Sequence, residues 1–510
     1  MKIILLLISF CVLCSAQFDN LDDAVVRAIL KDGTPRTIFE VQQKLEDAGG
    51  VLKPHIVANR GHDNPRFGSF SVFHTYTGPM QGGVVQEEEL FIGFFTTQRQ
   101  GVITTLQSFQ SSLMIEIIAW DYTKKMYNFW ELVGNGGSSE WHYRGDSQDV
   151  AADVEQINMG NKAAKFGQRL RCSGCHTLGG PILKEIEAPH NDWWNNNDKL
   201  NLGTLRLNFG SDPQNPEHFA ARMFFEAEDV SNLSKQVKKG IDRLVAAREG
   251  NLHEQMRSLV STMEMNLASD TKPLQAKSQI AIPKGFFVDE RLLGKSAPQI
   301  TIDTALYMQA LQTVQSRFAQ NETPGLIDAR HAFLVPTRSY IDNKVIDVLL
   351  HKGILDEELI ADILAIDFTN PVYSQKRKNL IRYIPKNAIN AQHLREQLIA
   401  NLQNTNETGA KELLSNLTDP RRNKEFHRKQ ALAFFDVCQQ KGNVFVTVMN
   451  WVKIATQRRV EIQSSQPAQN PRGTILEPGF RVIFPQNNIA TSAGKWFLNP
   501  VNGNLEINNK

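Results

Sequence analysis

One five-residue segment constrains this chain more than any other: residues 172–176 read Cys-Ser-Gly-Cys-His. The 510 residues include only five cysteines and 12 histidines. Two cysteines three positions apart, followed directly by a histidine, would therefore arise by chance in about one such chain in a thousand. Any fold of this chain has to present two thiols and one imidazole from a single short stretch.

The pattern Cys-x-x-Cys-His is the signature of covalent c-type haem attachment. Two thiols at this spacing can reach the two vinyl groups on one edge of a porphyrin, and the adjacent imidazole then lies beneath the ring with a nitrogen aimed at iron. We therefore expect one covalently attached haem c, bound through thioethers to Cys172 and Cys175. His176 would be the proximal ligand of the haem iron.

Two other chemistries would use only part of this segment. A redox-active disulfide needs no trailing histidine, and no βαβ pattern surrounds these cysteines. A structural zinc site would want a second pair of ligands. The other Cys-x-x-Cys spacing, Cys11 and Cys14, lies inside an apolar run at the amino terminus. Haem attachment accounts for more of these residues than either alternative.

The residues around the attachment segment resemble the class I cytochrome c family over residues 162–181. Residues 166–171 read Phe-Gly-Gln-Arg-Leu-Arg, and Thr-Leu-Gly-Gly-Pro follows His176. The resemblance implies that a short helix precedes the attachment segment and that the backbone carbonyl of Pro181 accepts the N–H of the proximal imidazole. Such a bond fixes the orientation of the ring and raises its basicity. The chain is far longer than a simple cytochrome c, and looks more like a large exported protein with one embedded haem domain.

The same resemblance implies a methionine downstream of the proximal histidine as the sixth ligand of iron. Met223 is at a plausible separation, but it lies on an apolar face of an expected helix, where a packing role fits better. His190 and His218 are the alternatives. The coordination number of the iron stays open, and with it the choice between electron transfer and ligand chemistry.

The amino terminus has the pattern of a secretory signal. Lys2 is followed by an apolar run over residues 3–13, and Cys14-Ser15-Ala16 then predicts cleavage before Gln17. The apolar run is shorter than the roughly 20 residues that span a bilayer. We therefore expect a soluble protein that is periplasmic or otherwise exported, without a stable membrane span after cleavage.

Export leaves Cys172, Cys175 and Cys438, too few cysteines for a disulfide scaffold in a chain of this size. Lys and Arg total 56 against 54 Asp and Glu, so no basic field favours nucleic acid. A protein that moves single electrons needs a redox partner protein. The sequence does not specify an oligomeric state.

The pattern of apolar residues predicts an α+β protein. We expect strands over residues 113–120, 126–133 and 140–145, and helices that include 241–267 and 391–402. The expected order is a signal peptide (1–16), a helical segment (17–59), an antiparallel β-rich domain (60–148), a mainly α cytochrome c-like haem domain (149–274), a linker (275–301), an α-helical domain (302–462) and an irregular tail (463–510).

The function that these observations favour is single-electron transfer by an exported c-type cytochrome, rather than catalysis. Two alternatives stay open. The chain could be a single-haem enzyme or a ligand sensor with an open iron site, or it could be a binding protein with an accessory haem domain. A two-haem peroxidase would need a second attachment segment, which the sequence lacks.

Overall fold

The computed structural model describes two compact units. Unit 1 comprises the described residues up to Arg248, and unit 2 those from Asn251 onward. This division falls inside the range 149–274 that was expected to form one haem domain. The described residues are 18, 20–58, 70–80, 82–95, 113–152, 172–173, 176, 178–182, 186, 230–248, 251–260, 265–268, 278–294, 298–315, 332–333, 335–439, 442–465 and 496–507.

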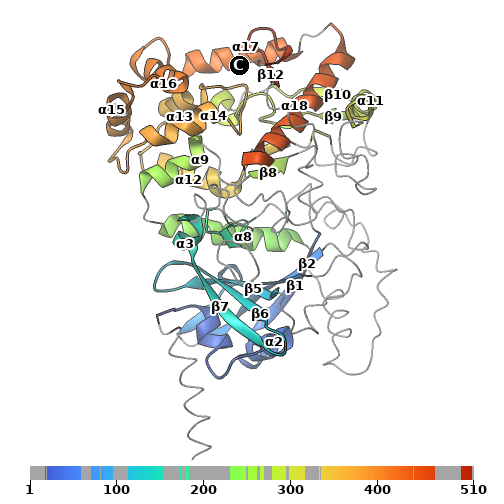
Figure 1. Cartoon of the computed structure of the whole chain (residues 1–510), viewed down its shortest axis with the longest axis vertical. Coiled ribbons are helices and arrows are strands. Elements are labelled where there is room, and N and C mark those ends of the chain that lie inside the picture. The colour runs from blue at the N-terminus through green and yellow to red at the C-terminus, as the bar shows by residue number, and fades with distance from the viewer. Residues whose placement is uncertain are drawn as a thin grey trace, which may run out of the picture. The chain divides into compact units, whose positions relative to one another are not determined.

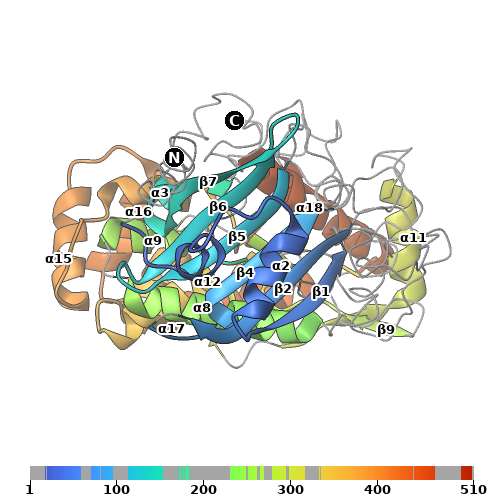
Figure 2. The ribbon, with the colours of Figure 1, turned by 90° about the horizontal axis from the view of Figure 1, so that it is seen from below.

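Unit 1 (Figure 1) contains a seven-stranded antiparallel sheet, in which β3 pairs with β2. The other strands have the spatial order β1-β2-β4-β5-β6-β7, which can be followed in Figure 2. The sheet confirms the expected β-rich region and the three strands predicted at its end. Between β5 and β6, Asp121 accepts the backbone N–H groups of Thr123 and Lys124, which closes the turn. The strands are β1 (Val51–Ala58), β2 (Phe70–Met80), β3 (Gly83–Val85), β4 (Leu90–Phe95), β5 (Leu113–Asp121), β6 (Met126–Gly134) and β7 (Ser139–Asp146).

Both faces of this sheet are covered, because side chains alternate between them along each strand. On the first face, Ile117 and Trp130 belong to a core shared with the π-helix η1 (Val25–Ile29) and helix α2 (Ile38–Asp47). On the second face, Tyr127 and Phe129 are buried on the side of α8 (Val230–Ala247). Figure 2 shows α2 and α8 on opposite sides of the sheet.

Asp23 joins the amino-terminal segment to the middle of the sheet. One carboxylate oxygen accepts the backbone N–H groups of Val25 and Val26, at 2.9 and 3.0 Å, at the start of η1. The other accepts the Asn128 side-chain amide at 2.7 Å and the Trp130 indole N–H at 2.9 Å. The side chain is fully buried, and this burial raises the pKa of Asp23 to about 6.

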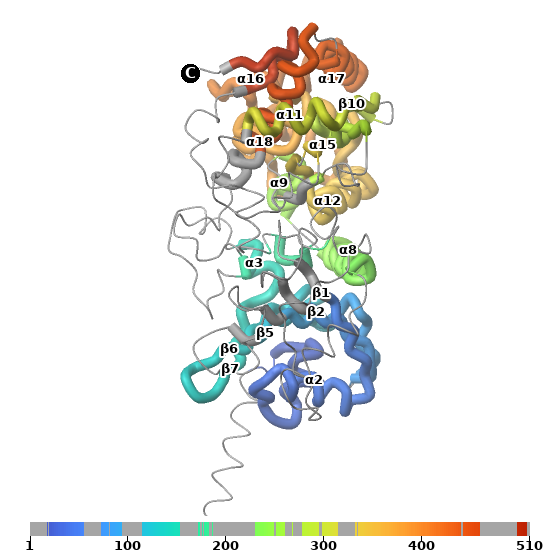
Figure 3. Tube along the Cα trace, turned by 90° about the vertical axis from the view of Figure 1, so that its right-hand side faces the viewer, coloured from blue at the N-terminus to red at the C-terminus, as the bar shows by residue number. Residues whose placement is uncertain are grey.

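Unit 2 is mainly helical, which completes the α+β class. Several of its helices begin with a side chain that accepts a backbone N–H group of the first turn; examples are Ser339, Asp356, Ser374 and Asn390. The helices are α9 (Leu252–Val260), α10 (Glu290–Leu293), α11 (Thr304–Gln315), α12 (Tyr340–His351), α13 (Glu357–Leu364), α14 (Gln375–Asn379), η8 (Leu380–Tyr383), α15 (Ala391–Leu402), α16 (Thr408–Thr418), α17 (Lys424–Gln439) and α18 (Val444–Ser465). Helix α15 matches its predicted bounds, and α11 packs against α18 (Figure 3).

Three short antiparallel strand pairs complete the described part of unit 2. They are β8 (Met265–Ala268) with β11 (Val335–Arg338), β9 (Gln279–Ala281) with β10 (Thr301–Asp303), and β12 (Trp496–Leu498) with β13 (Leu505–Ile507). The last pair shows that the expected irregular tail, 463–510, also contains regular structure.

Two expectations for the middle of the chain were wrong. The structure has α8, α9 and β8 in place of a single helix over 241–267. Asn251 starts the new helix α9, because its side chain accepts the backbone N–H of His253 and its backbone carbonyl accepts the N–H of Gln255. The described part of the expected linker 275–301 contributes to the core of unit 2. Phe286 and Phe287 are 1% and 0% exposed, and Phe287 contacts Trp451 with ring centroids 5.2 Å apart.

Within the described residues, we find no helix with the length and apolar character needed to cross a membrane.

The Asp23 network predicts a large loss of stability for Asp23→Ala. The substitution leaves the Trp130 and Asn128 donors and two backbone N–H groups without their acceptor, so we expect the free energy of unfolding at pH 7 to fall by about 2 kcal/mol or more. Asp32→Ala is the matched control, because Asp32 is exposed, and it should change stability by less than about 0.5 kcal/mol. Urea unfolding of the three proteins measures both effects.

The raised pKa of Asp23 also predicts the pH dependence of this loss. The folded chain binds a proton at Asp23 once the pH falls below about 6, whereas the unfolded chain binds one there only below about pH 3.8. Between these two values the folded state therefore gains stability as the pH falls. The difference between the parent and Asp23→Ala should therefore grow by about 1 kcal/mol from pH 7 to pH 5. A difference that shrinks over this range would contradict the pKa assignment.

Candidate functional site

The attachment segment begins with one helical turn. The carbonyl of Cys172 accepts the backbone N–H of His176 at 2.8 Å. Cys172 is 7% exposed and Ser173 is fully buried. Cys175 lies outside the described residues.

The imidazole of His176 is held by its own loop. Its Nδ1 donates to the carbonyl of Gly180 at 2.7 Å. The bond places the proton on Nδ1, so the lone pair of the neutral imidazole is on Nε2. The acceptor expected at Pro181 is therefore observed one residue earlier. The reason is the turn that follows His176, in which the N–H of Gly179 donates to the His176 carbonyl at 2.8 Å and brings the next peptide back toward the ring.

The sheet holds the other side of this imidazole. Phe129, on the second face of β6, packs edge to face against His176, with ring centroids 5.2 Å apart and an interplanar angle of 61°. Phe129 is 2% exposed, whereas His176 is half-buried. The imidazole is thus fixed by a hydrogen bond from the loop and by an aromatic ring from the sheet.

Two close approaches of backbone hold the loop in place. Gly179 has a φ of +71°, and a Cβ added there would overlap the backbone carbonyl of Ser147, the first residue of α3 (Ser147–Ala152). On the other side, Gly240 of α8 leaves room for the Tyr127 hydroxyl, and its missing Cβ would lie 3.4 Å from the ring of buried Pro181. The loop therefore lies against α3, the sheet and α8 together.

Charged and phenolic groups hold α8 on the sheet. Arg243 pairs with Glu88 at 2.8 Å and with Glu89, and its guanidinium lies 5.5 Å from the centre of the Trp120 ring. The Tyr127 hydroxyl donates to the Glu88 carbonyl at 2.6 Å. Burial raises the pKa of the Tyr127 hydroxyl well above its ordinary value, so this donor stays protonated.

A buried ion pair lies on the same sheet face as Phe129. Glu131, two residues along β6, is fully buried and accepts from the Arg144 Nε at 2.9 Å. His142 lies opposite Glu131 in the register of β6 and β7. Burial lowers the pKa of the His142 imidazole, with a smaller contribution from the charge of Arg144. The face that holds His176 therefore combines an aromatic ring with a charged pair.

The structure locates only part of the predicted site. Cys172 and His176 are both described, and a backbone hydrogen bond joins them. The remaining haem-binding thiol and the candidates for the sixth ligand, Met223, His190 and His218, lie outside the described residues. Among the residues that are described, no group of three or more His, Cys, Asp or Glu side chains could hold a metal ion.

The described part of the segment fits a proximal haem ligand. An Nδ1–H bonded to a backbone carbonyl is the usual way in which a metal-binding imidazole is oriented. No pattern in the sequence identifies Phe129 or Gly180 as contributors. Phe129 is in a predicted strand, but only its position in the folded sheet shows that it faces the attachment segment.

Comparisons with known proteins add no identification. No family model matches the chain, no curated protein matches its sequence, and no solved structure matches its fold.

The contact between Gly179 and Ser147 predicts that Gly179→Ala is unusually costly. Gly136→Ala is the matched control, because Gly136 also has a positive φ, +98°, but has nothing within 4 Å of an added Cβ. We expect the control to lower the free energy of unfolding by about 1 kcal/mol through backbone strain alone. Gly179→Ala should lower it by at least about 3 kcal/mol, because the overlap adds to the same strain.

Urea unfolding of both variants measures the difference. Equal losses for Gly179→Ala and Gly136→Ala would show that the loop does not depend on this contact.

Proposed function

We propose that this chain is an exported c-type cytochrome that binds one haem and transfers single electrons. Cys172 and Cys175 would form the thioethers, and His176 would be the proximal ligand. The observation that supports this most is the pairing of the Cys-x-x-Cys-His segment with an imidazole whose Nδ1 donates to the Gly180 carbonyl. The hydrogen bond alone would be weaker support for haem binding, because histidine side chains often donate to a backbone carbonyl.

The bound haem would supply an iron centre that changes its charge by one electron. The chain's own residues would set how the imidazole meets that centre. The Gly180 carbonyl, by accepting the Nδ1 proton, increases electron density on Nε2 and makes it a better ligand. Phe129 restricts rotation of the ring about its Cβ–Cγ bond, because its own ring lies 5.2 Å away.

Burial of the attachment segment supports the same proposal. Cys172 is 7% exposed, Ser173 is fully buried and Phe129 is 2% exposed. An environment with little water raises the cost of an added charge and so favours reduced haem iron. A redox partner protein would deliver the electron and a second would accept it.

The amino-terminal pattern supports export as part of this proposal. Thioether formation on c-type cytochromes follows export, so the secretory signal and the attachment segment are consistent with each other. We propose a periplasmic or otherwise exported chain that starts at Gln17 after cleavage.

The covalent bond predicts which variant loses haem. We expect the parent protein, expressed with its signal and with haem-maturation machinery, to keep its haem through acid–acetone extraction. Acid protonates an imidazole and breaks its bond to iron, but a thioether survives. The Cys172→Ala, Cys175→Ala double variant should lose the haem in the same extraction.

Cys438→Ala is the matched control, because Cys438 is a buried thiol of unit 2. It should keep its haem like the parent. Haem retained by the double variant after extraction, or lost by the control alone, would overturn the assignment of the thioethers.

A further inference from the structure

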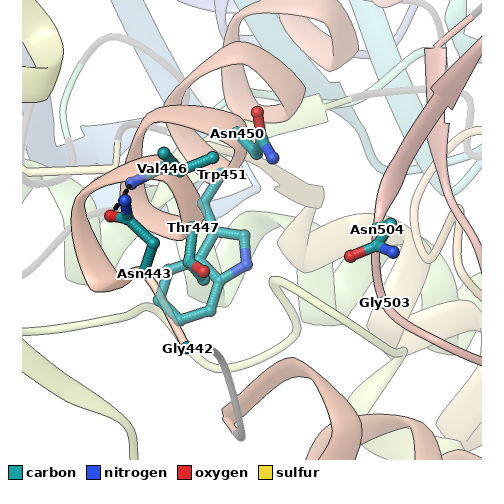
Figure 4. A pocket seen from close by; sticks show the side chains of 8 residues that line it. All are labelled: Gly442, Asn443, Val446, Thr447, Asn450, Trp451, Gly503 and Asn504. Atoms are coloured by element: carbon teal, nitrogen blue, oxygen red, sulfur yellow. Dashed lines mark hydrogen bonds between the residues drawn. The ribbon is translucent and has the colours of Figure 1, made fainter.

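Unit 2 contains a small pocket that lies away from the haem-attachment segment in the sequence. It lies between the start of α18 and the β12–β13 hairpin (Figure 4) and has a volume of about 190 Å³. Pockets that hold drug-sized ligands measure roughly 300–1,000 Å³, so this one suits a single ring. Its lining residues are Gly442, Asn443, Val446, Thr447, Asn450, Trp451, Gly503 and Asn504, and none of them is charged.

The Trp451 indole N–H and the Thr447 hydroxyl face this space, and neither has a hydrogen-bond partner in the described part of the chain. Trp451 is 4% exposed and Thr447 is 9% exposed. Figure 4 shows the indole nitrogen of Trp451 on the side of its ring that faces Gly503 and Asn504. The ring is fixed from behind by Phe287, with centroids 5.2 Å apart. Its N–H is therefore a donor held in place before any ligand arrives.

Asparagine side chains surround these two groups. The Oδ1 of Asn443 accepts the N–H of Val446 at 3.1 Å, so this side chain caps α18 and its amide N–H₂ remains as a donor. Asn450 is half-buried, and no described residue bonds to its side chain. Asn504 comes from the hairpin opposite (Figure 4). The pocket thus presents amide donors and acceptors, one hydroxyl and one indole N–H.

We propose that this pocket binds one neutral polyhydroxylated ring, a monosaccharide or a monosaccharide unit of a glycan. Hydroxyl groups both donate and accept, as the amides and the Thr447 hydroxyl do. A charged ligand would lose its hydration here without meeting an opposite charge. An apolar ligand would displace water from the Trp451 N–H and the Thr447 hydroxyl without replacing its hydrogen bonds, which costs about 1–3 kcal/mol for each group.

This site is independent of the proposed haem. All of its lining residues belong to unit 2, and none belongs to the attachment segment or to the sheet that holds it. Its test can therefore succeed or fail whatever the cofactor proves to be.

NMR spectra of the ¹⁵N-labelled full-length protein test the proposal, because each tryptophan gives one indole N–H signal. Seven tryptophans are present, and the signal missing from Trp451→Phe identifies Trp451. D-glucose, D-galactose, D-mannose, N-acetylglucosamine and the anionic sugar glucuronate are titrated in turn. We expect at least one neutral sugar to shift the Trp451 signal with a Kd on the order of millimolar, as suits so small a ligand.

Two conservative variants connect the binding to the pocket. Thr447→Val and Asn450→Ala each remove one hydrogen-bonding group and should weaken binding about three- to tenfold. The exposed Asn404→Ala is the matched control and should bind like the parent. The proposal is overturned if no neutral sugar shifts the Trp451 signal, if glucuronate binds more tightly than the neutral sugars, or if folded Thr447→Val and Asn450→Ala, checked by circular dichroism, both bind like the parent.

Discussion

The hydrogen bond from His176 Nδ1 to the Gly180 carbonyl, 2.7 Å long, decides what the attachment segment can do. It selects the tautomer with the lone pair on Nε2, and it does so within a five-residue loop. A flexible loop could not hold that geometry. The loop is held because Gly179 lies directly against Ser147 and because the ring of Phe129 packs against the imidazole.

The sheet of unit 1 supplies the rigidity that this loop needs. Its first face is occupied by the amino-terminal segment, which Asp23 ties to Asn128 and Trp130. Its second face is occupied by α8, which Arg243 ties to Glu88 and Glu89. With both faces covered, the strands that position Phe129 and Ser147 have little freedom to move. The sequence gives no role for the β-rich region. In the structure this region supports the loop that contains His176, the proposed proximal ligand.

Local patterns in the sequence were sufficient to predict several of the helices and strands. The apolar runs over residues 113–120 and 126–133 predicted β5 and β6 closely, and helix α15 has its predicted bounds and begins where Asn390 caps it. Long-range packing was not accessible in the same way. Phe286 and Phe287 lie in a stretch with weak periodicity, and only the helices that surround them explain why they are buried. The contact between Phe129 and His176 likewise depends on the register of a sheet far away in the sequence. The attachment motif itself was predictable, because its chemistry requires three residues at one spacing.

The most direct test of covalent haem attachment at residues 172–176 is one pair of optical spectra of the purified exported protein, oxidised and then reduced. We predict the spectrum of a c-type haem, one per chain, which keeps its thioether-type bands after alkaline pyridine treatment. A thioether-to-iron charge-transfer band in the oxidised form would identify a methionine such as Met223 as the sixth ligand. A low-spin spectrum without that band would favour His190 or His218, and a high-spin spectrum would identify an open iron site and favour an enzyme or a sensor. Purified exported protein without a haem spectrum, or with haem that shows unmodified vinyl groups, would contradict covalent attachment at Cys172 and Cys175.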